Sequence, residues 1–417
     1  MEIPREKYVN ELIDRKHNGL VKVVTGIRRV GKSYLLFTLY YRHLIQSGVD
    51  ADHIIRIAFD DRRFSELKDP DVLLRHLDSC MTDNGMYYLL FDEVQELTSF
   101  ESVLNSLLYR ENTDIYVTGS NSRFLSKDVL TEFRGRGDEV HLYPLTFSEF
   151  MSVYEGDKYE GWNEYYTFGG LPMVLMRKTW QQKSEYLSRL FTETYLKDII
   201  ARHNLRQNNE LDTLITILAS AVGSLTNPKR IADTFKTGTS SSISPATVKS
   251  YIDYLEDAFL ISGVQRYDVK GRRYITTPLK YYFEDVGLRN ARLNFRQQEE
   301  NHIMENIIYN ELRKRGYNVD VGVVEKQEKQ SDGNYQRKQY EVDFIVNQGS
   351  IRYYIQSAFV LPDEEKVRQE KMSLLNIDDS FKKIIVVKGP SMLKRDGDGV
   401  ITMSIFDFLL NENSLEL

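Results

Sequence analysis

Short apolar runs alternate with amphipathic stretches along the first 150 residues. Strands are expected at Val21–Val24, His53–Phe59, Tyr87–Phe91 and Ile115–Thr118, and helices at Tyr34–Ile45 and Phe100–Tyr109. Apolar strands interleaved with helices are typical of a parallel sheet that is covered by helices on both faces. The pattern therefore predicts an α/β domain over residues 1–150.

The pattern changes twice in the middle of the chain. Residues 151–205 read as a helical connector that is interrupted at Phe168-Gly-Gly-Leu-Pro172. Residues 206–292 predict three helices, two of which begin at a proline, a residue favoured in the first turn of a helix. Two strand-like stretches follow at Ile261–Tyr267 and Tyr274–Thr277. Three helices and a hairpin have the outline of a winged helix.

The last segment, residues 293–417, again alternates strands and helices. Its expected order is helix Glu299–Arg315, strand Asn318–Val324, polar loop Glu325–Lys338, strand Tyr340–Val346, strand Arg352–Ala358, helix Asp363–Leu375 and strand Lys383–Val387. This order predicts a second α/β domain. The chain is thus expected to have four parts, at residues 1–150, 151–205, 206–292 and 293–417.

Composition narrows the class of protein. The 417 residues include 55 Lys and Arg against 61 Asp and Glu, a net charge of −6, so only a local basic patch could bind nucleic acid. The single cysteine, Cys80, excludes an internal disulfide and a cysteine-based zinc site, and the seven histidines lack metal-ligand spacing. No apolar run approaches the roughly 18 residues of a membrane-spanning helix, so we expect a cytoplasmic protein without membrane contacts.

The strongest chemical signal is the segment Gly26-Ile-Arg-Arg-Val-Gly-Lys-Ser33. It matches the phosphate-binding pattern G-x-x-x-x-G-K-[ST] in full, between a predicted strand and a predicted helix. In such a loop, backbone N–H groups turn toward the phosphates, Lys32 reaches the β- and γ-phosphates of ATP, and the Ser33 hydroxyl ligates Mg²⁺. The two arginines inside the loop either touch phosphate or face solvent. The expected nucleotide-binding residues are Gly26, Arg28, Arg29, Gly31, Lys32, Ser33 and Tyr34.

Two adjacent carboxylates form the second signal. The apolar run Tyr87–Phe91 ends in Asp92 and Glu93, at a strand end of the kind where ligands bind in open α/β sheets. Asp92 is expected to hold Mg²⁺ through water, and Glu93 to act as the general base that polarises the attacking water. A glutamate at this point favours hydrolysis of the nucleotide over its mere storage.

Two later residues are candidates for contacts to the γ-phosphate. Asn121 follows the strand that ends at Thr118 and could touch the γ-phosphate and the attacking water, as the sensor residue of AAA-type ATPases does. The alternative is a turn of small polar residues. Arg136, in an Arg-Gly-Arg segment, could reach the nucleotide of a neighbouring subunit as an arginine finger, unless it is an ordinary surface arginine.

The segments GIRRVGKS, LLFDEVQ and TGSNS are followed by RGR and YPLTFSEF, and by three later segments at residues 168–172, 280–288 and 341–344. Together they resemble a family of prokaryotic AAA-type ATPases that carry a C-terminal domain of uncharacterised function. The resemblance covers essentially the whole chain. It implies an ATPase domain that uses ATP and Mg²⁺, a winged-helix region and a nuclease-like C-terminal fold.

The element order of residues 293–417 is similar to the core of restriction-endonuclease-like nucleases. Such a core needs an acidic residue on one strand and an acid-x-Lys triplet on the next to hold Mg²⁺ and activate water. Asp343 matches the first acid, and Glu305 or Glu311 could add a carboxylate from the preceding helix. Gln356 and Ala358 stand where the second acid and the lysine are needed. We therefore expect a nuclease-like binding module without metal-dependent cleavage.

A basic hairpin supplies the case for DNA binding. The hairpin segment has one negative residue, Asp268, and five positive residues: Arg266, Lys270, Arg272, Arg273 and Lys280. Such a hairpin could lie along a phosphate backbone, although winged helices also serve as protein interfaces. The sequence thus predicts an ATPase that couples its nucleotide state to DNA binding. The alternative is an ATP-controlled signalling or assembly switch that forms oligomers or recruits a protein partner and does not bind DNA.

Overall fold

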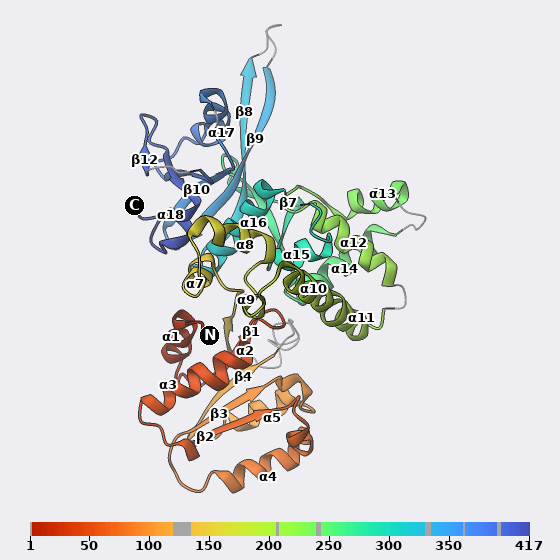
Figure 1. Ribbon diagram of the computed structural model, residues 1–417, viewed down its shortest axis with the longest axis vertical. Coiled ribbons are helices and arrows are strands. Elements are labelled where there is room, and N and C mark those ends of the chain that lie inside the picture. The colour runs from red at the N-terminus through yellow and green to blue at the C-terminus, as the bar shows by residue number, and fades with distance from the viewer. Residues whose placement is uncertain are drawn as a thin grey trace. The chain divides into compact units, whose positions relative to one another are not determined.

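The computed structural model describes residues 2–119, 135–205, 208–238, 243–297, 299–329, 335–361, 363–389 and 393–417. The chain forms two compact units. The first holds residues 1–144 and 257–259, and the second holds residues 145–256 and 260–417. In Figure 1 the main part of the first unit is coloured red to orange, and the second unit runs from yellow through green to blue.

The first unit is built on a five-stranded parallel sheet with the strand order β2-β3-β4-β1-β5. The strands are β1 (Val21–Thr25), β2 (Ile54–Ala58), β3 (Tyr87–Asp92), β4 (Thr113–Thr118) and β5 (Gly137–His141). Every residue of β1 and β3 is buried, because helices cover the sheet on both sides.

The helices of this unit are α1 (Glu6–Asp14), α2 (Lys32–Tyr34), a π-helical turn (Leu35–Tyr40), α3 (Tyr41–Gln46), α4 (Pro70–Cys80) and α5 (Phe100–Leu107), with 3₁₀ turns at Ala51–His53, Arg62–Lys68 and Val94–Glu96. Leu77 of α4 and Leu104 of α5 pack in one core with Phe91 of β3. The π-helical turn packs Tyr40 on Tyr116 of β4, with 4.6 Å between the ring centroids. The α/β class predicted for this region is confirmed.

The second unit contains an eight-stranded mixed sheet with the order β12-β13-β11-β10-β9-β8-β6-β7. The strands are β6 (Ile261–Asp268), β7 (Arg273–Phe283), β8 (Asn318–Lys329), β9 (Tyr335–Gln348), β10 (Ile351–Ala358), β11 (Lys382–Val387), β12 (Lys394–Arg395) and β13 (Ile401–Ser404). The pairs β6–β8, β10–β11 and β11–β13 are parallel, and the remaining neighbours are antiparallel. This sheet confirms the second α/β region.

The helices of the second unit are α7 (Phe147–Met151), α8 (Lys158–Phe168), α9 (Pro172–Leu175), α10 (Trp180–Leu190), a π-helical turn (Phe191–Leu196), α11 (Lys197–Arg202), α12 (Asn208–Ser220), α13 (Pro228–Gly238), α14 (Pro245–Asp257), α15 (Val286–Arg292), α16 (Glu300–Lys314), α17 (Glu364–Leu375) and α18 (Ile405–Leu410). Tyr309 of α16 packs near Phe344 of β9, whereas Leu374 of α17 shares a core with Ile345. No helix in the described ranges has the length and apolar character needed to cross a bilayer.

The region predicted as a winged helix has its three helices and its hairpin in the expected order. The hairpin is not a separate wing, however. Strand β6 pairs in parallel with β8, so that Arg266 lies opposite Val321 and the hairpin extends the larger sheet. The predicted boundary between residues 292 and 293 therefore separates strands of a single sheet.

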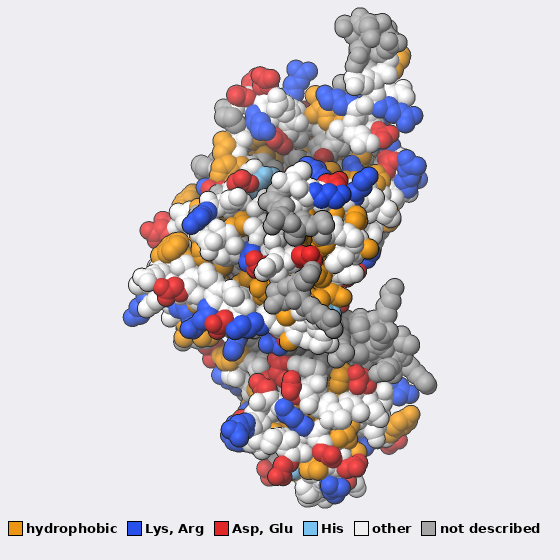
Figure 2. Space-filling model, turned by 90° about the vertical axis from the view of Figure 1, so that its right-hand side faces the viewer, with side chains coloured by type: hydrophobic (Ala, Val, Ile, Leu, Met, Phe, Trp, Pro, Cys, Tyr) orange, Lys and Arg blue, Asp and Glu red, His pale blue; other side chains and the backbone are white. Residues whose placement is uncertain are grey.

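The prediction of a polar loop at residues 325–338 is wrong over most of that range. Strands β8 and β9 stay paired as far as Lys329 opposite Tyr335, and Figure 1 shows them as a long projecting ribbon. Cross-strand hydrogen bonds satisfy the backbone of such a ribbon even where its side chains are polar and solvated. In Figure 2 basic side chains gather along the ribbon, which carries Lys326, Arg337 and Lys338.

Two segments that carry the family resemblance, residues 168–172 and 280–288, pack against each other. The N–H of Gly170 donates a 2.8 Å hydrogen bond to the buried Asp285 carboxylate. A Cβ on Gly287 would lie 2.0 Å from a carbonyl oxygen of the first segment, so only glycine fits there. These contacts give both segments a structural role.

Candidate functional site

The phosphate-binding segment forms the loop between β1 and α2. Gly26 has a φ of +129°, and a Cβ there would lie 2.3 Å from the carbonyl oxygen of Leu142. Glycine is therefore required, because a side chain would collide with backbone that cannot move freely. Gly31, with a φ of +107°, directly precedes α2 and leaves the helix N-terminus facing the loop.

Lys32 is the first residue of α2 and is only 5% exposed. Its Nζ donates hydrogen bonds to the carbonyl oxygens of Gly26 at 2.8 Å and Ile27 at 3.0 Å. Burial lowers the pKa of Lys32 to about 8, although the carboxylates of Glu93 and Asp92 act in the opposite direction. A buried ammonium held by neutral acceptors fits an anionic ligand such as a phosphate.

Asp92, at the end of β3, is buried beside two hydroxyl groups. The hydroxyls of Thr118 and Ser33 are hydrogen-bonded to its carboxylate. Burial raises the pKa of Asp92 above its ordinary value, and these hydrogen bonds oppose that shift. The structure thus brings together the hydroxyl and the carboxylate that the sequence predicts as magnesium ligands. Oxygen donors of these two kinds suit Mg²⁺.

Glu93 follows in a left-handed backbone conformation, with a φ of +49°. Its N–H donates to the Thr118 hydroxyl oxygen at 3.0 Å, and its carboxylate accepts a hydrogen bond from the Gln95 amide. A non-glycine residue in this conformation needs such support from its surroundings. Thr118 and Gln95 are therefore positioning residues.

The positioning roles of Thr118 and Gln95 were not predicted from the sequence. Thr118 is the last residue of the predicted strand beside β3, and Gln95 follows Glu93 by two residues. Thr118 could have been found from the sequence, because it is a polar residue at the end of the strand next to the one that ends in Asp92.

The other residues predicted for the nucleotide site differ in how far their side chains are exposed. Arg28 is half-buried, Arg29 is exposed with a φ of +65°, and Tyr34 is 41% exposed. Arg136 lies against α5, where it donates a 3.4 Å hydrogen bond to Asn105. Its role as an arginine finger stays a prediction. Asn121, the predicted sensor residue, lies outside the described residues.

The predicted DNA-binding residues separate into an exposed and a buried group. Lys270, Arg272 and Arg273 are exposed around the β6–β7 turn, and Arg266 is half-buried. Lys280 is only 3% exposed, and carboxylates surround its Nζ, so it does not contribute to a DNA-binding surface. The prediction of a phosphate contact at Lys280 is corrected for this reason.

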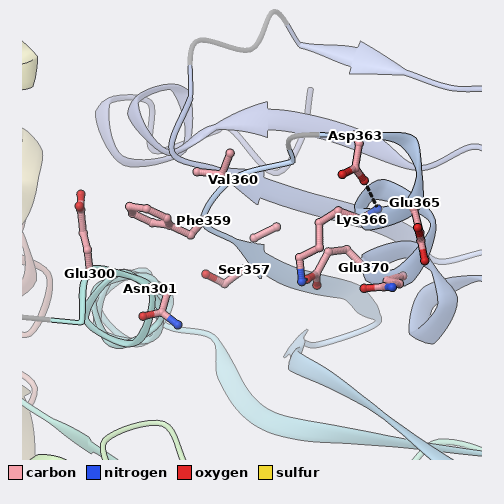
Figure 3. A pocket seen from close by; sticks show the side chains of 11 residues that line it. Glu300, Asn301, Ser357, Phe359, Val360, Asp363, Glu365, Lys366 and Glu370 are labelled. Atoms are coloured by element: carbon pink, nitrogen blue, oxygen red, sulfur yellow. Dashed lines mark hydrogen bonds and ion pairs between the residues drawn. The ribbon is translucent and has the colours of Figure 1, made fainter.

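A pocket of about 690 Å³ opens in the second unit where β10 ends, between the starts of α16 and α17 (Figure 3). Ser357 and Ala358 of β10 lie on its wall. Its charged lining residues are Glu300, Asp363, Glu365, Lys366 and Glu370. With four carboxylates and one ammonium, this lining repels rather than attracts a phosphate backbone.

The acidic residues predicted for a nuclease-like core do not form a metal site in the described ranges. No group of three or more His, Cys, Asp or Glu side chains there is arranged to hold a metal ion. The carboxylate Asp343, predicted as the first acid of a nuclease-like core, is buried in β9 and accepts a 2.8 Å hydrogen bond from the N–H of Ser357. Glu311 pairs instead with Arg315 at 2.8 Å.

Comparison with known proteins places these features in a family. A model described as an AAA domain matches residues 18–151, and one described as a domain of unknown function (DUF8612) matches residues 159–299. An uncharacterised protein of Haemophilus influenzae is 33% identical over 414 residues, which cover 98% of each chain. An uncharacterised protein of Methanocaldococcus jannaschii is 28% identical over 365 residues, or 84% of this chain and 77% of the relative.

Among solved structures, the Aeropyrum pernix Orc1 protein in complex with DNA is similar at 13% identity and a TM-score of 0.33, covering 70% of this chain and 92% of that one. The sequence relationship to the Haemophilus influenzae protein extends over nearly the full length of both chains. With its AAA domain at residues 18–151, the chain therefore belongs to that protein's family of AAA-type P-loop proteins.

Proposed function

We propose that the protein binds ATP together with Mg²⁺ and hydrolyses it at the P-loop of the first unit. The observation that carries this proposal is the convergence of Lys32, Ser33, Asp92 and Glu93 at the ends of β1 and β3. A buried ammonium, a hydroxyl–carboxylate pair and a second carboxylate are the groups that phosphoryl transfer from ATP to water requires.

Each of these residues has a distinct role in the proposed reaction. Lys32 binds the β- and γ-phosphates, for which it exchanges its contacts to two backbone carbonyls. Ser33 and Asp92 hold Mg²⁺, which neutralises phosphate charge when bound. Glu93 orients the attacking water and accepts its proton, while Thr118 fixes the backbone at Glu93.

We further propose that the nucleotide state is coupled to DNA binding through the β6–β7 hairpin. A cavity of about 570 Å³ borders this turn. Its lining includes the cations Lys270, Arg272 and Arg352 and the rings of Tyr267 and Phe381. Cations and aromatic rings together suit a nucleic acid strand, which offers phosphates and base faces.

The alternative is an ATP-controlled switch that assembles with itself or with a protein partner. Two acids, Asp378 and Asp379, lie on the wall of the same cavity, and the pocket at the end of β10 is lined mainly by carboxylates. The burial of Lys280 also removes one cation from the predicted basic surface. These features favour a protein partner with basic side chains.

The two proposals are separated by steady-state ATP hydrolysis with and without single- and double-stranded DNA, using Lys32→Ala and Glu93→Gln as controls. Turnover that rises with DNA and vanishes in both variants supports the DNA-coupled ATPase. A turnover rate that does not change when DNA is added, and that vanishes in both variants, supports the switch. ATP binding without turnover under any of these conditions contradicts autonomous hydrolysis.

A further inference from the structure

The second unit contains a cluster of charged side chains that the proposed function does not use. The Nζ of Lys280, on β7, lies 2.8 Å from Glu305 Oε1 of α16 and 2.7 Å from Glu341 Oε1 of β9. Asp343 Oδ1, also on β9, lies 3.6 Å away. One ammonium thus meets three carboxylates from two other elements.

Burial and hydrogen bonds hold this cluster in place. The side chain of Lys280 is 4% exposed, and those of Glu305 and Asp343 are 11% and 10% exposed. The buried Tyr282 hydroxyl donates a 2.5 Å hydrogen bond to Glu305 Oε1, and the second oxygen of Asp343 accepts the N–H of Ser357. While Lys280 is present, these contacts occupy oxygen atoms of Glu305 and Asp343 that a metal ion would need.

Glu341 and Asp343 are two residues apart in β9, so the alternation of side chains along a strand puts both on the same face of the sheet, and a β-bulge follows directly. The pairing of β8 with β9 passes from Asp320 opposite Ile345 to Gly322 opposite Val342, so that β9 has one residue more than β8 in this stretch. An extra residue breaks the alternation of side chains between the two faces of a sheet. The bulge allows the next residue, Phe344, also to lie near α16, with 6.4 Å between its ring centroid and that of Tyr309.

The distances suit an ammonium better than a metal ion. Values of 2.7 and 2.8 Å are those of charge-assisted hydrogen bonds, whereas Mg²⁺ needs oxygen ligands at about 2.1 Å. Burial and the nearby Glu305 raise the pKa of Asp343 above its ordinary value, whereas the Lys280 ammonium acts to lower it. The Lys280 ammonium is the cation that lies within ion-pair distance of all three carboxylates.

We propose that Lys280 is an internal cation at the place where a metal-dependent nuclease with this order of elements would hold Mg²⁺, and that the cluster binds no divalent metal while Lys280 is present. The residues that a nuclease would offer from β10 are Gln356 and Ala358, which bring neither a carboxylate nor a lysine. Lys280 instead ties β7 to α16 and β9. Its removal should free the oxygen atoms of the three carboxylates, which can then turn toward a divalent cation that takes the place of the ammonium.

The test is Mn²⁺ binding to the nucleotide-free full-length chain, measured by electron paramagnetic resonance and by thermal unfolding. The natural protein should bind no Mn²⁺ at this cluster. Lys280→Met should lower the unfolding temperature by roughly 5–15 °C, since it leaves buried carboxylates without their cation. It should also bind one Mn²⁺ per chain, recover part of the lost stability with Mn²⁺, and lose both effects when Asp343→Asn is added.

A matched control is Lys314→Met. Lys314 is equally buried in the same unit, and its Nζ lies 3.2 Å from the carboxylate of Glu149. This variant should also unfold at a lower temperature, but it should not gain a Mn²⁺ site. Lys280→Gln, which keeps a polar group at the position, is the second variant should Lys280→Met fail to fold.

Three results would overturn the proposal. The first is a stoichiometric Mn²⁺ in the natural protein that Asp343→Asn removes. The second is a folded Lys280→Met or Lys280→Gln variant that binds no Mn²⁺. The third is Mg²⁺- or Mn²⁺-dependent nicking of plasmid DNA that Asp343→Ala abolishes.

Discussion

Two buried lysines, one in each unit, have opposite electrostatic surroundings. Lys32 is 5% exposed and Lys280 is 3% exposed. Burial lowers the pKa of Lys32 to about 8, because its hydrogen bonds go to backbone carbonyls and nearby carboxylates only partly compensate. Burial also acts to lower the pKa of Lys280, but Glu305, Asp343 and Glu341 raise it above its ordinary value.

This difference separates a ligand-binding lysine from a structural one. The charge of Lys32 is incompletely balanced within the protein, so an incoming phosphate gains a strong interaction with it. The charge of Lys280 is already surrounded by carboxylates, and a further anion would be repelled. The degree of burial is nearly the same, and the neighbours decide what each lysine does.

The largest effect is expected from Glu93→Gln. The amide cannot accept the proton of the attacking water, so turnover of ATP should fall by about 10²–10⁴-fold. Lys32 and Ser33 remain in place, and ATP binding should therefore change little. Turnover and nucleotide binding measured on the same preparation check this. Glu96→Gln, a change at an exposed residue paired with Lys68, is the matched control and should retain turnover.

The two lysines should respond to removal with opposite signs. Lys32→Met should stabilise the nucleotide-free first unit by about 1–3 kcal/mol at neutral pH, because it removes a poorly balanced buried charge. Lys280→Met should destabilise the second unit by about 3–5 kcal/mol, because it leaves buried carboxylates without a cation. Hydrogen exchange on peptides from each unit, followed in urea, measures the two changes separately. If both substitutions stabilise their units, or both destabilise them, the proposed difference between the two lysine sites is contradicted.

ATP binding should weaken as the pH rises. The charged form of Lys32 binds phosphate, and its pKa of about 8 means that the ammonium is largely present at pH 7 and largely lost at pH 9. Affinity for Mg²⁺-ATP should therefore fall by up to about tenfold over this range. Titration calorimetry at fixed salt measures the change, and Lys32→Met should abolish the dependence. An affinity that stays constant to pH 9 would contradict the lowered pKa.

The smallest effect is expected at the basic hairpin. Replacing Lys270 and Arg272 together by alanine should weaken DNA binding by roughly 3–10-fold at low salt, because two phosphate contacts are lost. Fluorescence anisotropy over a salt series checks both the affinity and its slope. Arg63→Ala, at an exposed arginine of the first unit, is the control. No DNA binding by the natural protein at low salt would favour the assembly switch.

The nucleotide site was accessible to sequence analysis because its chemistry is local. Eight consecutive residues from Gly26 form the loop, and Asp92 and Glu93 directly follow one apolar strand. The parallel sheet then brings the ends of these strands together, as the alternation of strands and helices predicts. The contact of Gln95 with Glu93 was missed, because sequence spacing does not give the direction of a side chain in a turn.

The Lys280 cluster could not be predicted in the same way. Its members come from β7, α16 and β9, and the spacing of residues along the chain does not show that these distant segments meet. Lys280 therefore looked like one more cation of a basic hairpin. The strand pairing of β6 with β8, which joins this hairpin to the larger sheet, also depends on contacts between distant segments.

The central claim is tested most directly by ATP turnover of three full-length proteins side by side: the natural chain, Lys32→Met and Lys280→Met. The natural protein should hydrolyse ATP. The turnover rate of Lys32→Met should be lower by a factor of at least about 100, while the variant remains folded. Lys280→Met should retain turnover at temperatures where it stays folded. Full activity in Lys32→Met would contradict the assignment of the P-loop as the catalytic site.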